Sequence, residues 1–298
     1  MDRRNSLGMR ILLLGKHGQL GWELQQTLPY LGEVVALSRA EADLAQTDSL
    51  RDVLNELAWD ALVNAAAYTA VDRAETEADA ARQVNSNAPR IMAEEAKKRN
   101  ALFLHFSTDY VFDGLKSEPY CETDTPNPSG IYARTKLEGE RAIQDIGGLN
   151  FIFRTSWVYS MTHKDNFVAK VIQWASRQSE LRAVTDQTAC PTWARALAEL
   201  TSLALFRIMQ MGGSWASEHC GVYHIASADF VNRYELTRYI VQRLNLPVTV
   251  KPALTQEFPS PVSRPAFSAL SSTRFAQTFN LRVPGWREML DLALDASP

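Results

Sequence analysis

A glycine-rich segment near the start of the chain places the tightest constraint on its fold. The segment reads Gly15-x-x-Gly18-x-x-Gly21, and it follows the apolar run Arg10–Leu14. Such a turn between a buried strand and a helix lets a pyrophosphate approach the backbone, and the helix N-terminus offers N–H groups and a positive dipole to the phosphates. The leucines that follow, up to Leu31, recur at helical spacing. The segment therefore predicts the first strand, turn and helix of a dinucleotide-binding domain.

Apolar runs and helical patterns alternate through the first half of the chain. The predicted strands are Arg10–Leu14, Val34–Leu37, Ala61–Asn64, Leu102–Ser107 and Phe151–Arg154. The predicted helices are Gly18–Leu31, Leu50–Leu57, Ala80–Arg99 and Ile131–Ile146. Continuously apolar strands indicate a parallel sheet that is covered on both faces. We therefore expect an α/β fold with a doubly wound, Rossmann-like parallel sheet, in which ligands bind at the carboxyl ends of the strands.

The pattern becomes less regular after Thr155. Helical stretches at Phe167–Arg177, Ala194–Met211 and Tyr234–Leu244 are separated by turn-rich segments. We expect a dinucleotide-binding domain over residues 9–155, with later segments at about 168–227 crossing back to it. A smaller α/β substrate-binding lobe is expected over residues 228–298, with 156–167 contributing.

Composition narrows the class of protein. A chain of 298 residues that is 46% hydrophobic can bury one large core or two coupled ones. Its net charge of −3 gives no basic excess for nucleic acid. The cysteines and histidines show no disulfide or metal-ligand spacing, and no apolar run is long enough to span a bilayer. We expect a soluble, cytoplasmic protein with no nucleic-acid or membrane partner, and leave monomer or homodimer open.

The end of the second predicted strand bears on which dinucleotide is bound. An acidic residue there accepts hydrogen bonds from the adenosine ribose of NAD, whereas a basic residue accommodates the 2′-phosphate of NADP. This chain carries Ser38 and Arg39, with Asp43 shortly after. Arg39, together with Lys16 in the glycine loop, favours NADPH on charge grounds. If Arg39 is only a solvated surface charge, NADH is the alternative.

A tyrosine and a lysine one helical turn apart predict the chemistry. Tyr132 and Lys136 fall in the predicted helix Ile131–Ile146, so their i, i+4 spacing puts them on one face. A nearby ammonium lowers the pKa of a phenol from its usual value of ~10 toward the range useful for proton transfer. Thr108 follows the fourth predicted strand and can hydrogen-bond a carbonyl oxygen, while Asp109 is a substrate contact or a turn former. These residues predict a redox enzyme with a tyrosine acid.

Five motifs taken together resemble the extended short-chain dehydrogenase/reductase family. They are the glycine loop, Asn64–Asp72, Ser107–Phe112, the Tyr132/Lys136 pair and Arg154–Tyr159. Further similarity at Asp186–Thr192 and Ser263–Pro265 extends the resemblance from about Met9 to the C-terminus. The combination is more specific than any one motif.

The resemblance implies an activity: NAD(P)H-dependent reduction of the C4 carbonyl of dTDP-4-dehydro-L-rhamnose to dTDP-L-rhamnose. The product would serve rhamnose and cell-surface polysaccharide biosynthesis, lipopolysaccharide included. Tyr132 would donate the proton, and Lys136 would lower the pKa of Tyr132 and hold the nicotinamide ribose. Thr108 would hydrogen-bond the reacting oxygen.

The resemblance also implies two sets of binding residues. The expected substrate contacts are Thr108, Asp109 and Trp157 around the sugar, and Arg264 at the diphosphate, whose geometry suits a guanidinium. The expected cofactor-binding residues are Gly15, Gly18, Gln19, Leu20, Gly21, Ser38, Arg39, Asp43, Leu44, Ala67, Tyr68, Thr69, Tyr132 and Lys136.

Two positions depart from relatives of this kind. Ser38 stands where family members can carry an acidic residue, which adds to the case for NADPH. Some relatives form a dimer bridged by Mg²⁺ through glutamates. This chain keeps Glu23, but Arg195 occupies a position that is acidic in those relatives. Arg195 argues against that Mg²⁺ site, Mg²⁺ stays open as a second cofactor, and no metal ligands are assigned.

Two other classes of function stay open. A nucleotide-sugar epimerase of the same fold would retain NAD tightly, and a 4,6-dehydratase would need an acidic pair after Thr108, which Asp109 and Tyr110 do not provide. A non-catalytic, NADP-binding regulatory subunit, resembling the beta subunit of methionine adenosyltransferase, would need no turnover. The intact Thr108, Tyr132 and Lys136 favour the enzyme.

Overall fold

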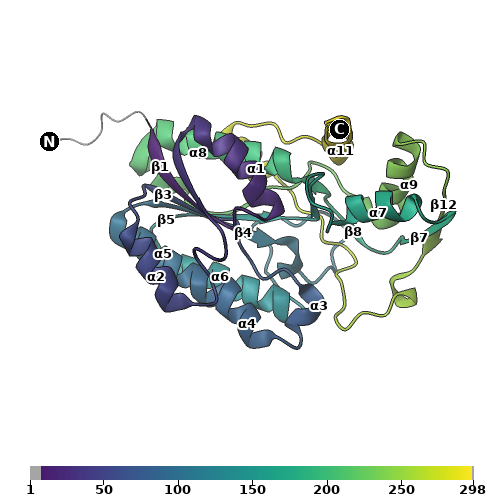
Figure 1. The fold of residues 1–298 in the computed structure, drawn as a ribbon, viewed down its shortest axis with the longest axis horizontal. Coiled ribbons are helices and arrows are strands. Elements are labelled where there is room, and N and C mark those ends of the chain that lie inside the picture. The colour runs from purple at the N-terminus through teal and green to yellow at the C-terminus, as the bar shows by residue number, and fades with distance from the viewer. Residues whose placement is uncertain (1–7, 297–298) are drawn as a thin grey trace. The chain divides into compact units, whose positions relative to one another are not determined.

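A six-stranded sheet with the strand order β10-β5-β4-β3-β1-β2 organises the first part of the chain (Figure 1). The computed structural model describes residues 8–296. The strands of this sheet are β1 (Met9–Leu14), β2 (Gly32–Leu37), β3 (Ala61–Asn64), β4 (Leu102–Thr108), β5 (Leu149–Thr155) and β10 (Gly221–His224). Strand β1 pairs in parallel with β2 and β3, and β3 pairs in parallel with β4. The predicted parallel sheet is confirmed.

Helices cover both faces of this sheet, as a doubly wound fold requires (Figure 1). Helices α1 (Gln19–Thr27) and α8 (Ala194–His219) lie on one face, and α2 (Thr47–Glu56), α5 (Ala88–Arg99) and α6 (Ile131–Ile146) lie on the other. The Ser202 hydroxyl donates a 2.8 Å hydrogen bond to Thr27 Oγ1, which ties α8 to α1.

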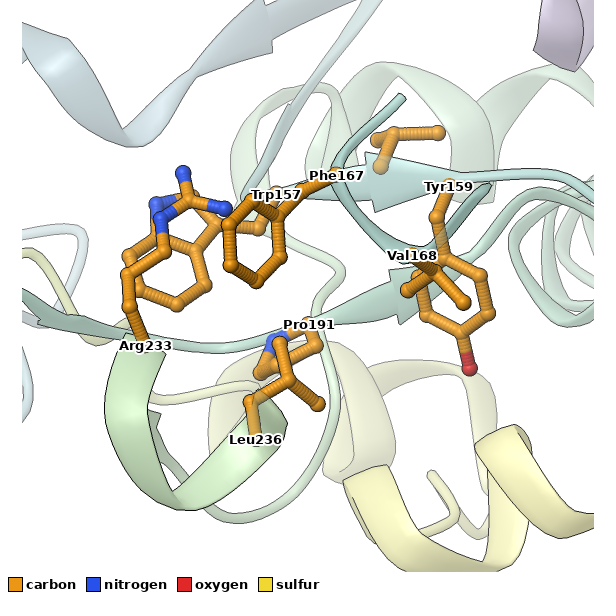
Figure 2. A pocket seen from close by; sticks show the side chains of 8 residues that line it. Trp157, Tyr159, Phe167, Val168, Pro191, Arg233 and Leu236 are labelled. Carbon is orange, nitrogen blue, oxygen red and sulfur yellow. The ribbon is translucent and has the colours of Figure 1, made fainter. Parts of the chain in front are cut away.

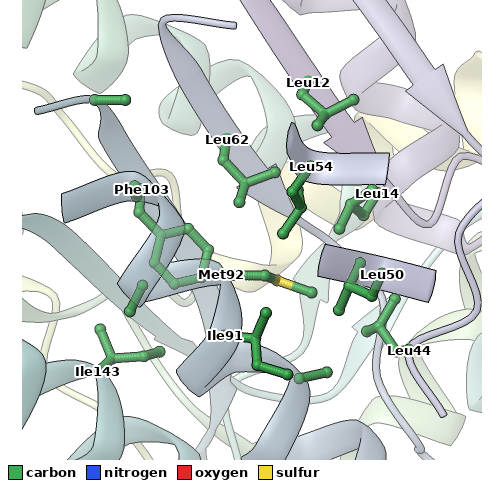
Figure 3. Packing of buried hydrophobic residues seen from close by; sticks show 14 of the residues in the cluster. Leu12, Leu14, Leu44, Leu50, Leu54, Leu62, Ile91, Met92, Phe103 and Ile143 are labelled. Atoms are coloured by element: carbon green, nitrogen blue, oxygen red, sulfur yellow. The ribbon is translucent and has the colours of Figure 1, made fainter. Parts of the chain in front are cut away.

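The core beneath α2 and α5 is mainly aliphatic and also contains Met92, Phe103 and Trp59 (Figure 3). Its fully buried members include Leu12, Leu50, Leu62, Met92 and Phe103. Burial of such side chains stabilises the fold by roughly 1.5–3 kcal/mol each. Helices cover both faces of the sheet, and this is why continuously apolar runs form its strands.

Strands β2 and β3 lie on opposite sides of β1 in the sheet. From β1 the chain passes to β2 on one side and then to β3 on the other, so the carboxyl ends of β1 and β3 form a topological switch point. The loops after these two strands approach closely there. Ala65 N donates a 3.1 Å hydrogen bond to Leu14 O, and Gly15 adopts φ +88°. A Cβ on Gly15 would lie 2.8 Å from Ala66 N.

The chain divides into two compact units. The described part of the first unit runs to Ser107 and includes Ile131–Phe153 and Ala198–Tyr223. The second comprises Thr108–Gly130, Arg154–Leu197 and the described residues from His224 onward. The chain thus re-enters the first unit at 198–223, whereas 168–197 belongs to the second. That these units are the cofactor-binding and substrate-binding domains stays a prediction, and residues 297–298 of the expected lobe lie outside the described residues.

The second unit is built from short strand pairs and helices. The paired strands are β6 (Val158–Tyr159) with β9 (Thr192–Trp193), β7 (Glu180–Val184) with β12 (Thr249–Ala253), and β8 (Thr188–Ala189) with β11 (Val231–Asn232). The helices are α7 (Phe167–Ala175), α9 (Arg233–Arg243), α10 (Thr273–Phe279) and α11 (Trp286–Asp295). Trp286, Leu236 and Val171 belong to its buried apolar cluster.

Several predicted helices differ from the observed ones. The first ends at Thr27 because Pro29 lies in the 3₁₀ turn Leu28–Tyr30 that follows. The expected helix 80–99 is broken into α4 (Ala78–Arg82), a π-helical turn (Gln83–Asn87) and α5, after the short α3 (Val71–Ala74). Two further 3₁₀ turns are Asp109–Val111 and Thr255–Glu257.

Helix α8 runs longer than expected, but its backbone breaks at Gly212, which has φ 82° and ψ 177°. The predicted bounds Ala61–Asn64 and Ile131–Ile146 match the observed elements. No helix within residues 8–296 is both long enough and apolar enough to cross a membrane.

The close approach at the switch point predicts a large cost for Gly21→Ala. A Cβ on Gly21 would overlap the carbonyl oxygen of Gly15, so the glycine loop or α1 must shift. Overpacking of this kind costs about 1–3 kcal/mol of unfolding free energy, measurable by urea denaturation. Gly213→Ala is the matched control, because a Cβ there meets no atom within 4 Å and alanine favours a helix by up to ~1 kcal/mol. Equal stability of the two variants would contradict this account.

Candidate active site

The glycine loop lies at the end of β1 and is fixed to the neighbouring strand. Gly15 N and Lys16 N both donate to Leu37 O, at 3.0 and 3.2 Å. Helix α1 begins directly after Gly18, and Gly18 provides no side-chain cap. The first N–H groups of α1 are therefore available to an anion, as the predicted cofactor site requires. The Gln19 Oε1 atom is buried there with no hydrogen-bond partner among the described residues, which marks a polar atom that a ligand can satisfy.

Two cations near the end of β2 are paired with carboxylates. Lys16 Nζ lies 2.7 Å from Glu41 Oε2, and the Ser38 N–H and hydroxyl donate to the same oxygen at 2.8 and 2.7 Å. The hydrogen bonds from Lys16 and Ser38 lower the pKa of Glu41 to about 2. Arg39 is mostly exposed and lies 3.3 Å from Asp43 Oδ2. A 2′-phosphate would therefore compete with Glu41 and Asp43 for these two cations.

The loop after β3 is held by a buried asparagine that the sequence pattern did not single out. Asn85 Oδ1 accepts from Tyr68 N at 2.9 Å, and Asn85 Nδ2 donates to Tyr68 O at 3.1 Å. The π-helical turn Gln83–Asn87 carries this side chain. The three expected cofactor contacts at residues 67–69 therefore belong to a loop with a fixed backbone. The Tyr68 hydroxyl donates to Glu77 at 2.6 Å, and this bond raises the pKa of Tyr68.

Lys136 is buried within the first unit, one turn after Tyr132 on α6. Its Nζ donates a 2.6 Å hydrogen bond to Phe106 O at the end of β4, and lies 3.2 Å from His105 Nε2. Burial lowers the pKa of Lys136 to about 8, while the negative charge of Glu140 opposes this shift. The structure confirms that Tyr132 and Lys136 lie on one helix, i and i+4 apart.

A histidine connects Lys136 to the switch-point strand β3. Ala66 N donates to Asn64 Oδ1 at 3.1 Å, so Asn64 Nδ2 is the atom that faces His105 Nδ1, also at 3.1 Å. Burial, and then the charge of Lys136, hold the pKa of His105 well below its usual value, so its ring is neutral. If Nδ1 accepts from Asn64, the ring proton sits on Nε2 and faces the lysine nitrogen. A neutral amine can accept that proton and an ammonium cannot, so this network favours a low pKa for Lys136.

The second unit holds the four expected substrate residues, and Asp109 forms a buried hydrogen-bonded centre there. Asp109 Oδ2 accepts from the Ser156 hydroxyl at 2.9 Å and from the Ser268 hydroxyl at 2.6 Å. Its Oδ1 accepts from the Thr108 hydroxyl at 3.1 Å. Burial raises the pKa of Asp109 to about 6, although these three hydroxyls oppose the shift. Thr108 is therefore positioned by Asp109, and the direct contact of either residue with a substrate stays a prediction.

Trp157 lies in a strained part of the backbone beside an unexpected arginine. Its φ of +40° is uncommon for a bulky side chain. The Arg233 Cζ atom lies 3.6 Å from the Trp157 ring centroid and 4.2 Å from that of Phe167 (Figure 2). The charges of Asp109 and Arg264 both influence the pKa of Arg233, which brings three of the expected substrate residues into the surroundings of this one guanidinium.

Trp157, Phe167 and Arg233 line a small cavity of about 110 Å³ in the second unit (Figure 2). The remaining lining residues are apolar or aromatic: Val158, Tyr159, Val168, Pro191 and Leu236. Sequence reasoning missed Arg233 because one arginine at the start of a predicted helix is typical of a solvated surface. Within residues 8–296, no group of three or more His, Cys, Asp or Glu side chains is placed to hold a metal ion.

The raised pKa of Asp109 predicts a pH-dependent difference between wild type and Asp109→Asn. The pKa is 3.8 in its ordinary state and about 6 when folded. The wild type thus loses stability as the pH rises from about 4 to about 6, because the buried carboxyl must ionise, and the loss totals on the order of 3 kcal/mol. Asparagine can accept from both serines and donate to Thr108 without ionising. Urea denaturation across this pH range should show the unfolding free energy of Asp109→Asn rising relative to that of wild type as the pH rises. A difference between the two proteins that does not change with pH would contradict the raised pKa of Asp109.

Comparison with known proteins identifies relatives over nearly the whole chain. The family model described as the RmlD substrate binding domain matches residues 9–297. A dTDP-4-dehydrorhamnose reductase of Burkholderia thailandensis is 40% identical over 96% of this chain and 98% of its own length. The solved dTDP-4-dehydrorhamnose reductase of Bacillus anthracis in complex with NADP is 29% identical, with a TM-score of 0.88 over 97% of this chain and 99% of that one.

More distant structures share only the fold. A UDP-glucose 4-epimerase of Thermus thermophilus in complex with NAD has a TM-score of 0.78 but 19% identity, over 96% of this chain and 98% of that one. The resemblance drawn from the five motifs is confirmed, since the family model and the reductase relatives extend over nearly the whole chain. The chain belongs to the family described as the RmlD substrate binding domain.

Proposed function

We propose that this protein is an NADPH-dependent oxidoreductase that reduces the C4 carbonyl of dTDP-4-dehydro-L-rhamnose to give dTDP-L-rhamnose. The observation that carries the proposal is the buried Lys136, one turn from Tyr132, in the unit that also carries the glycine loop. The reductase relatives and the NADP complex of one of them support the same activity and cofactor.

The cofactor would be held by the loops at the β1/β3 switch point. The uncapped start of α1 and the buried Gln19 Oε1 suit a pyrophosphate and its neighbouring groups. Ser38 and Arg39 would face the adenosine ribose and its 2′-phosphate. Arg39 would then leave its ion pair with Asp43 and bind the phosphate. When bound, NADPH supplies the hydride that C4 receives.

The chain's own residues would supply the proton and fix the carbonyl. Tyr132 gives its phenolic proton to the C4 oxygen, so the carbonyl becomes a secondary alcohol. Lys136, as the ammonium, stabilises the phenolate that remains. The Thr108 hydroxyl can donate to the same oxygen when it is released from Asp109, and a protonated Asp109 carboxyl permits that release. No step assigned to the protein needs a metal ion.

The other functional classes are not favoured. A regulatory subunit does not need a buried lysine one helical turn from a tyrosine, and relatives named as reductases match nearly the full chain. The epimerase likeness extends to the fold alone. We further propose that the enzyme works in the cytoplasm as a monomer or homodimer, and that its product feeds a cell-surface polysaccharide such as lipopolysaccharide.

Tyr132→Phe tests the proposed acid. NADPH oxidation with dTDP-4-dehydro-L-rhamnose should fall by about 10²–10⁴-fold because the proton donor is lost. The variant should still bind NADPH, because the other expected cofactor-binding residues are unchanged. Tyr30→Phe is the control, since Tyr30 is 88% exposed. A wild type that binds NADPH but does not turn over would favour the regulatory class, and tightly retained NAD would favour an epimerase.

The lowered pKa of Lys136 predicts how the rate depends on pH. In the ligand-free enzyme, kcat/KM should fall about tenfold per pH unit above the Lys136 pKa of about 8, because the ammonium that stabilises the phenolate is lost. Lys136→Arg keeps its charge across this range. Its rate should be lower throughout, but its decline near pH 8 should be absent. The same decline in both enzymes would assign it to another group.

A further inference from the structure

The Arg233 guanidinium is a half-buried charge of the second unit that has no carboxylate partner among the described residues. Arg233 begins α9, and its backbone N–H donates to Gln187 O at 3.2 Å. Its side chain makes neither an ion pair nor a hydrogen bond with any residue between 8 and 296 that the structure describes. Arg243 and Arg282, in the same unit, each contact a carboxylate.

Two aromatic faces hold this guanidinium in place. The Trp157 and Phe167 ring centroids lie 3.6 and 4.2 Å from its Cζ atom, so the guanidinium lies over both rings (Figure 2). Cation–π contact stabilises the charge at its faces and leaves the N–H groups at its edge unused. Those N–H groups are the atoms that bind phosphate or carboxylate in bidentate fashion.

The electrostatic surroundings also favour an anion. Burial lowers the pKa of Arg233 to about 10, and the positive charge of Arg264 adds to this lowering while Asp109 and Tyr110 oppose it. A cation that is withdrawn from water without a counter-charge is unfavourable unless a ligand provides one. Two guanidinium groups whose charges repel suit a ligand with two negative charges close together, which describes a diphosphate.

The cavity next to Arg233 has room for such a group. Its volume of about 110 Å³ is several times the ~10–15 Å³ that one water molecule needs on the same measure. The rest of its lining offers mainly apolar and aromatic surface. The arginine is therefore the main source of polar specificity in the cavity.

We propose that Arg233 binds a phosphate of the nucleotide diphosphate, with Trp157 and Phe167 holding its guanidinium edge-on to the ligand. The proposal rests on the proposed nucleotide-sugar substrate. It makes Trp157 a residue with two functions, since the ring expected to contact the sugar also clamps the phosphate-binding arginine. Binding of the diphosphate would thus fix the orientation of the Trp157 ring.

Arg233→Met tests this role without requiring turnover. Methionine keeps an apolar stem between the two rings but removes the charge and the N–H groups. By titration calorimetry, dTDP should bind about 10–100-fold more weakly to the variant. Thymidine, which has no phosphate, should bind the variant almost as well as it binds wild type. The ratio of the thymidine Kd to the dTDP Kd should therefore fall by about the same 10–100-fold. With the sugar substrate, KM should rise while kcat changes much less.

Three controls separate the possible outcomes. Arg238→Met changes an exposed arginine on the same helix, which pairs with Glu235, and should bind dTDP as wild type does. NADPH affinity reports that each variant is folded. If Arg233→Met fails to fold, Arg233→Lys, which keeps the charge but not the planar fork, should bind dTDP more weakly than wild type while the salt dependence of binding is kept. An unchanged dTDP affinity in Arg233→Lys would contradict bidentate binding by Arg233.

Unchanged dTDP affinity in folded Arg233→Met would overturn the role of Arg233 and leave the reductase proposal standing. Equal losses for thymidine and dTDP would also overturn it, because the arginine would then support the pocket rather than bind phosphate. A wild type that binds NADPH but no dTDP would overturn the proposed substrate and this role together.

Discussion

The proposed chemistry depends on the hydrogen bond that holds the buried Lys136 ammonium against the Phe106 carbonyl. A buried ammonium is unfavourable by itself. In the first unit Lys136 Nζ donates to the Phe106 carbonyl, and the neutral His105 ring lies 3.2 Å from it. This arrangement ties α6 to the end of β4, and through Asn64 to the switch point where the glycine loop lies. Burial lowers the pKa of Lys136 to about 8, close to the pH at which a proton donor on α6 must work.

Buried charge also organises the second unit. Asp109 collects hydroxyl groups from three separate segments, at Thr108, Ser156 and Ser268, and burial keeps its pKa near 6. Arg233 is stacked on two rings rather than paired with a carboxylate. Strained or incompletely compensated groups of this kind concentrate at functional sites, because a ligand completes them. Each unit therefore withdraws at least one charged side chain from water without pairing it with a carboxylate: Lys136 in the first unit and Arg233 in the second.

Local sequence patterns predicted the elements that depend on burial alone. Ala61–Asn64 and Ile131–Ile146 match because a continuous apolar run and a regular helical stripe each have one stable solution. The predicted helix 80–99 contains the π-helical turn Gln83–Asn87, which the local pattern did not predict. Asn85 in this turn bonds the Tyr68 backbone, a contact between segments that are distant in the sequence. Tyr132 and Lys136 were recognisable from their spacing. The roles of His105 and Arg233 could not be predicted, because they depend on contacts with residues that are distant in the sequence.

The most direct test of the reductase account follows the hydride itself. Wild-type protein would be incubated with dTDP-4-dehydro-L-rhamnose and NADPH deuterated at C4 of the nicotinamide, using each stereoisomer in turn, and the sugar product examined by NMR. The account predicts one deuterium at C4 of dTDP-L-rhamnose from one isomer and none from the other. Product that carries deuterium at another carbon, or no labelled product from either isomer, would contradict it.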